Sequence, residues 1–512
     1  MIGLTVGIFL LILSLTLAIT YWAAKRTNTA NEFYAAGGSL SAKENGFALA
    51  GDWMSAAAFL GFSGLVALYG MDGSLYAVAA LVGFLVVLML IAEPMRNTGR
   101  FTLGDVIAER MQSRHARLAA VVGTIVVNLA YMVPPQMAGA GALIKLMLGI
   151  SYDASIVLVG IGMIVYVLFG GMIATTWVQI VKAVLLLAAA IVLVVMLLAA
   201  VSFHPLTLFS SVEQTYGSKM LMPGNYLKHP LDALSLFMSF IFGVAGLPHI
   251  MTRFYTVPDA RTARKSVLWL MFLAGGFFLV TTLIGFAAAT FVGQPAILAA
   301  DKGGNLALPL LAQYLGGGAG TLGGQVFLAA ICAIAFAAIL AVVAGLTLAS
   351  SGAIAHDLYV NVIRKGRVSE HDQVRVAKIA TLAVGAIAVG FGLLAQGINV
   401  GVLVILAIAV AASANFPIIF LSLFWRRFNT AGVIGGIAVG LVSSVVLALL
   451  GPAFLQGKAI FPIVNPTILS MPLGFLGALL GTWIGGRNPA HEARFDAFSF
   501  KAHSGMVVNK EQ

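Results

Sequence analysis

Long apolar runs alternate with short polar connections along the whole chain. The runs are about 20 residues long, the length that a helix needs to cross the hydrocarbon core of a bilayer. About thirteen of them can be counted, at approximately residues 2–22, 46–70, 74–95, 119–148, 154–172, 177–202, 232–251, 266–292, 323–352, 377–395, 401–424, 431–450 and 468–486. Because lipid admits only helices and closed barrels, and short alternating segments are not seen, the pattern predicts an all-α integral membrane protein with about 13 transmembrane helices.

Two of these runs are interrupted by glycine, at 46–70 and at 232–251, and they stand five spans apart. Binding sites in transporters form where helices break near the middle of the membrane. The spacing therefore predicts two repeats of five helices each. The expected segments are a leading helix at 1–22, a first repeat at 46–202, a second repeat at 232–424, two trailing helices at 431–486 and a tail at 487–512.

The composition supports a membrane protein. Of the 512 residues, 60% are hydrophobic and 9% are charged, whereas about a quarter of the residues of a soluble domain are charged. A soluble protein of this composition could not cover its surface with polar groups. The single cysteine, Cys332, lies in an apolar run, which excludes a disulfide framework.

Basic residues are concentrated in alternate connections. Of the 29 Lys and Arg residues, 23 fall on one side of the predicted membrane and 4 on the other, while Lys145 and Lys182 lie inside predicted helices. Cytoplasmic loops carry the excess of basic residues, so the N-terminus is expected outside and the C-terminus inside. Lys182 is expected to snorkel to the inner surface. The net charge of +11 is therefore attributed to membrane topology and not to nucleic-acid binding.

The acidic residue Asp52 follows Gly51 about seven residues into the second span. A carboxylate inside a membrane is costly and indicates a functional site by default. Two roles are compatible with this position: part of the path of a cation or proton, or the cap of a broken half-helix.

Three polar residues, Asn128, Tyr131 and Gln136, share one broad face of the fourth span. They would either line a cavity or make hydrogen bonds between helices. His249 and Arg253, at the predicted cytoplasmic end of the seventh span, are expected to anchor that helix at the membrane interface.

His356 and Asp357 are expected to form a polar exit from the ninth span. The sequence reveals no metal-ligand cluster and no nucleophile with a base nearby. Neither enzyme activity nor a cofactor is expected.

Seven short segments carry a recognisable combination of residues: Glu32–Gly38 (EFYAAGG), Ala50–Ser55 (AGDWMS), Gly99–Val106 (GRFTLGDV), Gly170–Trp177 (GGMIATTW), Gly246–His249 (GLPH) with Arg253 and Phe254, Ala341–Thr347 (AVVAGLT) and His356–Tyr359 (HDLY). Together they resemble the sodium:solute symporter family, and most closely its acetate permease branch, over nearly the full length. The resemblance implies the five-plus-five inverted-repeat fold named after a bacterial leucine transporter, and alternating access.

The resemblance also implies a cation site. By position, a sodium ion would be bound by the backbone carbonyls of Gly51, Met54 and Ala338. Two hydroxyl side chains usually complete this site, but the corresponding residues here are Ala341 and Val342. Because a hard cation needs several oxygen ligands, the transported cation is left open between Na⁺ and H⁺, with Asp52 as a candidate proton carrier.

Where sugar-transporting relatives place polar groups, this chain has Ala57, Ala58, Phe240 and Gly243. An apolar pocket cannot replace the many hydrogen bonds that a sugar makes with water. A small monocarboxylate needs only an apolar wall and backbone N–H groups at its charged end. The candidate substrate-binding residues are Ser55, Ala57, Phe59, Asn128, Tyr131, Gln136, Gly243 and Gly246.

These features predict a monomeric symporter of a bacterial inner membrane, surrounded by lipid, that couples a cation to uptake of a short-chain monocarboxylate, with acetate as the best single substrate. The alternatives are a symporter for proline, pyruvate or pantothenate, and a membrane sensor that binds a solute without moving it.

Overall fold

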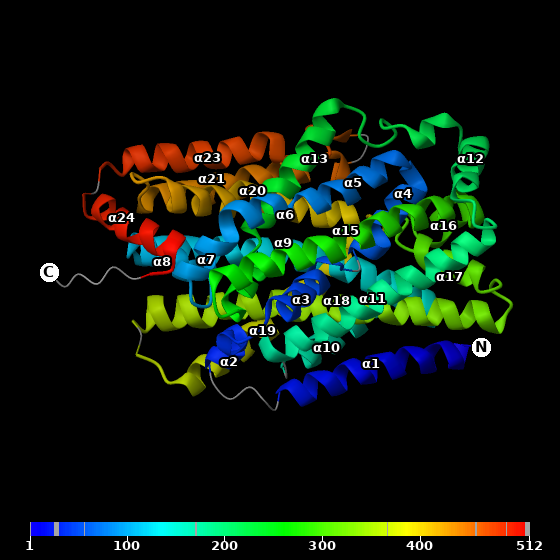
Figure 1. Ribbon diagram of the computed structural model, residues 1–512, viewed down its shortest axis with the longest axis horizontal. Coiled ribbons are helices and arrows are strands. Elements are labelled where there is room, and N and C mark those ends of the chain that lie inside the picture. The colour runs from blue at the N-terminus through cyan, green and yellow to red at the C-terminus, as the bar shows by residue number, and fades with distance from the viewer. Residues whose placement is uncertain are drawn as a thin grey trace.

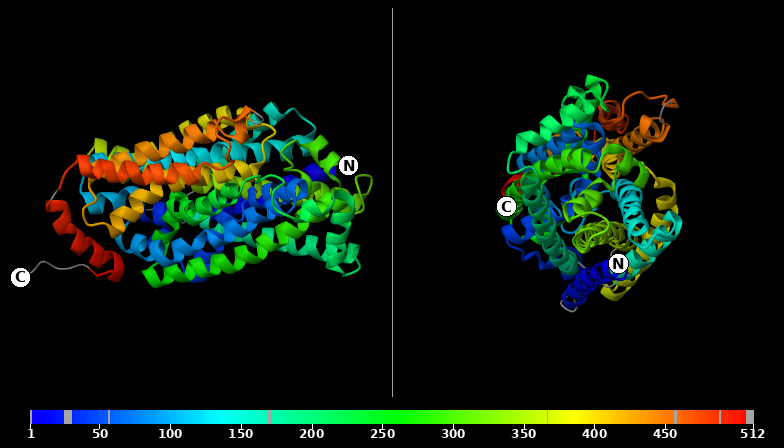
Figure 2. Two further views of the ribbon diagram at one scale, coloured as in Figure 1. Left: turned by 90° about the horizontal axis from the view of Figure 1, so that it is seen from above. Right: turned by 90° about the vertical axis from the view of Figure 1, so that its right-hand side faces the viewer.

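The computed structural model describes residues 2–24, 30–55, 57–168, 172–365, 367–455, 458–487 and 489–506. Every regular element within these ranges is helical, which confirms the all-α prediction. The helices run along the long axis of an elongated bundle (Figure 1), and Figure 2 shows the same bundle from above and end-on.

The bundle is formed by long helices joined by shorter ones. The long helices, and the shorter segments that continue them, are α1 (Ile2–Ala24), α3 (Ala42–Trp53), η2 (Ala57–Phe62), α4 (Ser63–Tyr69), α5 (Met71–Val82), α6 (Phe84–Val86), η3 (Val87–Ile91), α7 (Ala92–Thr98), α9 (Arg114–Leu148), α10 (Tyr152–Leu168), α11 (Met172–Ala200), α13 (Pro230–Gly243), α15 (Ala260–Phe291), α18 (Leu322–Gly352), η7 (Ala353–Ile363), α19 (Glu370–Gly392), α20 (Val400–Phe424), α21 (Thr430–Leu449) and α23 (Thr467–Ile484). The connecting elements are α2 (Ala30–Ala35), η1 (Ala36–Gly38), α8 (Leu103–Met111), α12 (Pro205–Tyr216), η4 (Ser218–Leu221), η5 (Val244–Gly246), α14 (Pro248–Thr252), η6 (Arg253–Thr256), α16 (Gln294–Ala300), α17 (Ala307–Leu315), η8 (Leu393–Ala395), α22 (Pro452–Leu455) and α24 (Pro489–Ser504).

Fewer helices than expected have the length and hydropathy of a membrane span. Nine helices of the described chain do so, or eleven if each of two bent pairs is one span. The expected spans 2–22 and 154–172 coincide with α1 and with α10, and α10 has only 17 residues. The predicted number of about thirteen is therefore not reached by these criteria, because an apolar run does not show how much of it becomes one straight helix.

The two bent pairs lie where the glycine pattern predicts broken spans. The helices Ala42–Trp53 and Ala58–Tyr69 meet at 53°, and Pro230–Gly246 and Pro248–Thr256 meet at 43°. A broken helix frees backbone N–H and C=O groups in the interior of the bundle, where they can bind a ligand.

Local sequence sets both ends of α3. Ser41 and Glu44 form a capping box, in which the Glu44 N–H donates to Ser41 Oγ at 3.2 Å and the Ser41 N–H donates to Glu44 Oε2 at 2.9 Å. The helix ends at Trp53, and Met54 leaves the helical conformation at φ −70° and ψ 66°. The Ser55 N–H then bonds to the Trp53 carbonyl at 2.7 Å instead of reaching back to Gly51.

The connections predicted to be rich in Lys and Arg gather at one end of the bundle. Figure 1 shows α2, α8 and α24 at this end and α12 and α16 at the opposite end, where α1 begins. The apolar helix α20 is buried from Val400 to Ile419, so this part of it lies in the interior of the bundle.

Candidate functional site

The break in α3 brings Asp52 against Arg253 of η6. Arg253 Nε lies 2.6 Å from Asp52 Oδ2, and the two side chains are 2% and 3% exposed. Arg253 Nη1 also donates to Thr176 Oγ1 of α11 at 2.8 Å. Because buried charges are tolerated when they are paired and hydrogen-bonded, Asp52 and Arg253 form an internal tie between the two broken spans.

This ion pair corrects one expectation from the sequence. Arg253 and His249 were expected at the membrane interface, but both side chains are buried. Both residues belong to the second segment of the bent pair, Pro248–Thr256, and α14 packs against α18 and α9, so they lie inside the bundle and not among lipid headgroups.

Close contact between α3 and α11 places Gln179 beside Asp52. A Cβ atom on Gly51 would lie 2.2 Å from the Gln179 carbonyl oxygen, so the helices can approach this closely only at a glycine. Gln179 Nε2 donates to Asp52 Oδ1 and, at 2.9 Å, to the Ala341 carbonyl of α18. Gln179 Oε1 has no hydrogen-bond partner among the described residues.

Lys182 lies one turn further along α11 and points into the same interface. Its side chain is 3% exposed, and Nζ lies 3.5 Å from the Ala338 carbonyl oxygen of α18. The expectation that Lys182 snorkels to the surface is therefore wrong, because this face of α11 packs between α3 and α18.

The three carbonyls expected to bind a cation border this interface. Gly51 and Met54 lie at the carboxyl end of α3, where the last carbonyls of a helix lack intrahelical partners and carry partial negative charge. Ala338 lies across from them on α18 and is buried. Its carbonyl is the one that Lys182 contacts.

A small cavity lies beside the broken helices. Its volume is about 10 Å³, and it is lined by Trp53, Ser55, Ala58, Phe62, Phe240, Phe278 and Val404. The rings close around it: Trp53 meets Phe240 edge-on at 6.0 Å between centroids, and Phe62 lies 5.9 Å from Phe278. None of the lining residues is charged. The indole Nε1 of Trp53 is buried and has no hydrogen-bond partner among the described residues.

Of the candidate substrate residues with described side chains, Phe59, Asn128, Gln136, Gly243 and Gly246 lie outside this lining. Gly243 and Gly246 are contact points with α20, since added Cβ atoms would lie 2.3 Å from the Ile408 carbonyl and 2.5 Å from the Ala411 carbonyl. Phe59 is buried, and its ring lies 5.5 Å from that of Phe277.

The polar face expected on the fourth span is buried in α9. Asn128 Nδ2 donates to Ser350 Oγ of α18 at 3.1 Å, which is a bond between helices. Gln136 is fully buried, and its side-chain oxygen and nitrogen have no partner in the described part of the chain. The side chains of Ala57 and Tyr131 lie outside the described residues.

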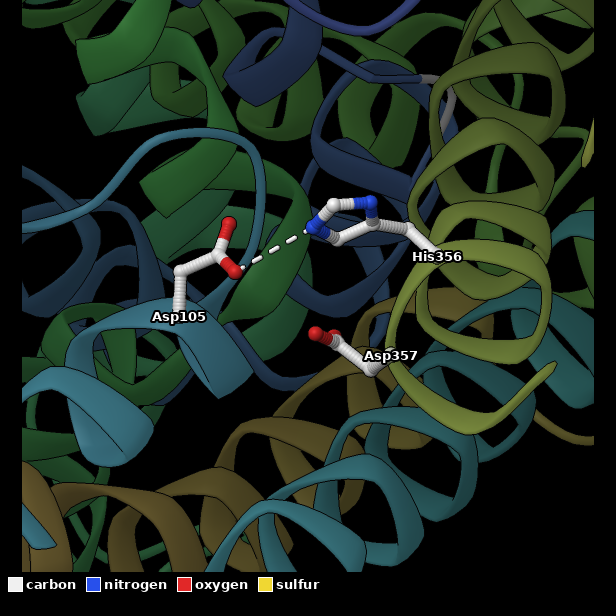
Figure 3. A group of neighbouring side chains, drawn as sticks. All are labelled: Asp105, His356 and Asp357. Carbon is white, nitrogen blue, oxygen red and sulfur yellow. Dashed lines mark hydrogen bonds and ion pairs between the residues drawn. The ribbon is translucent and has the colours of Figure 1, made fainter. Parts of the chain in front are cut away.

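A second polar group, absent from the expectations, joins α8 to η7, the helical segment that follows α18. Figure 3 shows Asp105 converging with His356 and Asp357, whose ligand-type atoms all lie within 4.8 Å of one another. His356 Nε2 lies 3.2 Å from Asp105 Oδ1. Arg117 Nη1 donates to Asp105 Oδ1 at 3.2 Å and to Asp357 Oδ1 at 2.8 Å.

His356 and Asp357 were expected only to form a polar exit from the ninth span, whereas folding joins them to Asp105, and Asp105 and His356 are 251 positions apart. The guanidinium of Arg117 supplies the positive charge that the buried Asp357 and the partly buried Asp105 need, so the group forms an ion-pair network. Burial of Asp105 opposes its ionisation. The hydrogen bond and charge of His356, together with the charge of Arg117, outweigh burial and lower the pKa of Asp105 below its usual value.

Sequence reasoning missed the roles of Trp53, Gln179 and Lys182 at these sites. Gln179 and Lys182 carried a usable signal, since two polar residues three positions apart in an apolar run share one helix face. Trp53 carried no such signal, because the sequence does not show whether the N–H of an indole has a hydrogen-bond partner.

Comparison with known proteins places this geometry in a family. The model of the sodium:solute symporter family matches residues 33–440. An uncharacterized symporter of Bacillus subtilis (strain 168), YwcA, is 47% identical over 514 residues, which cover 98% of this chain and 99% of that protein.

Two solved structures share the fold at low sequence identity. A Na⁺-coupled sialic acid symporter in a substrate-bound outward-open state has a TM-score of 0.73 at 17% identity, covering 94% of this chain and 97% of its own. The nucleobase-cation-symport-1 family transporter Mhp1, in a closed conformation with bromovinylhydantoin bound, has a TM-score of 0.55 at 15% identity, covering 92% and 99%. The fold is therefore that of the leucine-transporter-like class of membrane proteins.

Proposed function

The chain belongs to the sodium:solute symporter family, and from this premise we propose that it couples the entry of a cation to the uptake of a short-chain monocarboxylate, with acetate as the best single substrate. Membership makes it a multi-pass solute symporter and not an enzyme. Within the proposal, the cation is Na⁺, as the family name implies, and it is bound by the carbonyls of Gly51, Met54 and Ala338.

The observation that carries the choice of substrate is the unpartnered indole N–H of Trp53 at an apolar cavity. An indole N–H can only donate a hydrogen bond, and a buried donor without an acceptor is costly. A carboxylate oxygen would supply the missing acceptor. Ser55, the other lining residue with a polar side chain, offers a hydroxyl donor to the second oxygen.

Backbone groups add to the anion-binding end. N–H groups in the first turn of a helix lack intrahelical partners. In the half-helix that follows the break, the Phe59 N–H bonds back to the Ser55 carbonyl at 3.0 Å, and this amino end lies next to the lining residues Ser55 and Ala58. A helix amino end favours an anion without requiring a buried arginine.

Size and polarity of the cavity favour a short aliphatic acid over a sugar. A volume of about 10 Å³ is room for little more than one water molecule, so the pocket must open modestly for acetate and greatly for a sugar. The lining aromatic rings offer an apolar wall to a methyl or ethyl group. Arg253 is engaged by Asp52 and is not free to bind the substrate.

The proposal includes an orientation and a setting. We place the protein in a bacterial inner membrane as a functional monomer, with the end that carries α8 and α24 in the cytoplasm. Residues 46–202 and 232–424 form the two repeats that move against each other.

Uptake of labelled acetate into proteoliposomes tests the proposal. Gradients of sodium and of pH are applied separately, and protein-free liposomes control for acetic acid that crosses lipid. We expect accumulation above this control, competition by propionate and none by sugars. Uptake no greater than in protein-free liposomes under either gradient, or competition by sugars without competition by propionate, contradicts the proposal.

A further inference from the structure

A basic cavity lies on the side of the bundle, between the start of α15 and the segment formed by η3 and α7. Its volume is about 350 Å³. The residues that line it are Leu88, Glu93, Arg261, Arg264, Lys265 and Leu268. The helix α15 packs against both η3 and α7, and Arg96 of α7 donates to the Pro258 carbonyl at 2.8 Å, just before α15 begins. The walls of the basic cavity are therefore held together by the fold itself.

Positive charge exceeds negative charge in this lining. Three of the lining residues are basic and one is acidic, so three positive charges and one negative charge leave a formal charge of +2. Arg264 Nη1 lies 3.6 Å from Glu93 Oε2, but these side chains are 48% and 36% exposed, so their attraction is weak. Arg261 and Lys265 form no ion pair within the described ranges of the chain. The basic cavity therefore attracts an anion.

The exposed face of α15 changes from basic to apolar along the helix. Arg261, Arg264 and Lys265 are exposed on its first two turns. The exposed apolar side chains that continue the same face, three or four positions apart, are those of Leu268, Trp269, Phe272 and Leu279. Tryptophan is enriched where a membrane meets water. The change between Lys265 and Leu268 therefore marks the boundary between lipid headgroups and hydrocarbon.

The spacing of these residues matches the dimensions of a phospholipid at that boundary. A rise of 1.5 Å per residue puts Leu268 about 5 Å further along the axis than Arg264 and Lys265. The headgroup region on each side of a bilayer is about 5–8 Å thick. An acyl chain that packs against Leu88 and Leu268 would thus have its phosphate at the level of the basic side chains. A soluble anion would make no use of the two leucines.

We propose that the basic cavity binds one anionic phospholipid, with its phosphate at Arg261, Arg264 and Lys265 and an acyl chain against Leu88 and Leu268. Guanidinium groups bind phosphate oxygens through paired hydrogen bonds. A zwitterionic headgroup would bring its own cation, which the basic residues repel, so a lipid such as phosphatidylglycerol is preferred. The inference goes beyond the proposed function and depends on neither the transported solute nor the cation.

Native mass spectrometry of the purified protein in a neutral detergent tests the inference by counting retained lipids. Dioleoylphosphatidylglycerol and dioleoylphosphatidylcholine are added separately, and we expect the wild type to retain phosphatidylglycerol in preference. The triple variant Arg261→Gln, Arg264→Gln, Lys265→Gln should bind it at this site about a hundredfold more weakly, since each basic residue near a lipid surface contributes roughly fivefold. It should therefore retain one molecule fewer than the wild type.

The matched control removes the same charge elsewhere. Arg364→Gln, Lys365→Gln, Arg367→Gln changes three exposed basic residues between η7 and α19 that do not line the basic cavity. Because both triple variants alter only exposed side chains, both should fold, and the control should retain phosphatidylglycerol like the wild type. Glycerol phosphate, which has the phosphate but no acyl chains, should not displace the lipid at equal concentration.

Thermal unfolding gives a second readout. A ligand that binds the folded state stabilises it, so phosphatidylglycerol should raise the unfolding midpoint of the wild type more than phosphatidylcholine does. This difference should disappear in the triple variant of α15 and should diminish at high salt.

Four outcomes overturn the inference. They are equal retention of the two lipids by the wild type, unchanged retention by the triple variant of α15, an equal loss in the control variant, and displacement by glycerol phosphate. Neither readout involves acetate or Na⁺, whereas the proposed function is tested by acetate uptake. A protein that accumulates acetate without a preference for phosphatidylglycerol refutes the lipid site alone.

Discussion

Arg253 Nε lies 2.6 Å from Asp52 Oδ2, and this buried ion pair links the two broken spans of the bundle. Asp52 is the last residue but one of α3, and Arg253 begins η6 within the segment Pro248–Thr256 that follows the second bend. The pair therefore joins the end of the first half-helix of one broken span to the second segment of the other. It sets the position of α3 relative to α11 and α18, on which the proposed cation site depends.

Removing the charge of Asp52 should destabilise the protein strongly. Asp52→Asn leaves Arg253 buried without its counter-charge, and breaking one partner of such a pair costs about 3–5 kcal/mol of the free energy of unfolding. Thermal unfolding in detergent measures the loss. Asp496→Asn, at the exposed pair with Arg426, is the matched control and should change little. If Asp52→Asn were as stable as Asp496→Asn, the ion pair of Asp52 with Arg253 would not be essential to the fold.

Replacing Trp53 by phenylalanine should impair uptake more than it weakens the fold. Trp53→Phe keeps an aromatic ring but removes the pyrrole part of the indole with its N–H, whose bond to a carboxylate is worth about 1.5–3 kcal/mol, or roughly a ten- to hundredfold rise in the KM for acetate. Because this N–H has no partner among the described residues, any fall in thermal stability should reflect only the space left by the smaller side chain.

The control is Trp269→Phe, at a partly exposed tryptophan on α15 remote from the cavity lining. It should leave the KM for acetate unchanged. If Trp53→Phe had the same KM for acetate as the wild type, the indole would not belong to the proposed anion-binding end.

A methyl group at Gly51 should push α3 and α11 apart. The added Cβ of Gly51→Ala would lie 2.2 Å from the Gln179 carbonyl oxygen, and overpacking of this kind costs about 1–3 kcal/mol. Thermal unfolding and ²²Na⁺ binding should both be weakened. Gly276→Ala, where nothing lies within 4 Å of the added atom, should be neutral or slightly stabilising. An unaffected Gly51→Ala protein would mean that this contact does not hold the site.

Stability should depend on Asp105 at acidic pH. Although burial opposes its ionisation, the charges of His356 and Arg117 lower the pKa of Asp105 below its usual 3.8. A lowered carboxyl pKa stabilises the folded state above the unfolded value, and this contribution is lost as the pH falls through the folded value. The unfolding midpoint of the wild type should therefore fall below about pH 4, and in Asp105→Asn this part of the pH dependence should be absent. The same acid sensitivity in both proteins would assign it to other carboxyl groups.

The sequence was sufficient to predict where the two helices break, but it did not show which side chains meet near the breaks. Glycine beside Asp52 and the glycines up to Gly246 are local features, and helix interruption is a local property of the backbone, so both bends could be predicted. Lys182 shows the limit. A lysine in an apolar helix can reach the surface or the interior, and only packing against α18 decides between them.

The sequence by itself determined that this chain is an all-helical membrane symporter with two broken helices. Hydropathy, the distribution of basic residues and the short motifs were enough, because burial in lipid and the cost of unpaired backbone groups depend on the composition of each segment. Only the tertiary structure decided that Asp52 pairs with Arg253, that Asp105 meets His356 and Asp357, and that Lys182 contacts Ala338. These pairings join residues at least 156 positions apart. Such contacts depend on the packing of whole helices, which no local pattern specifies.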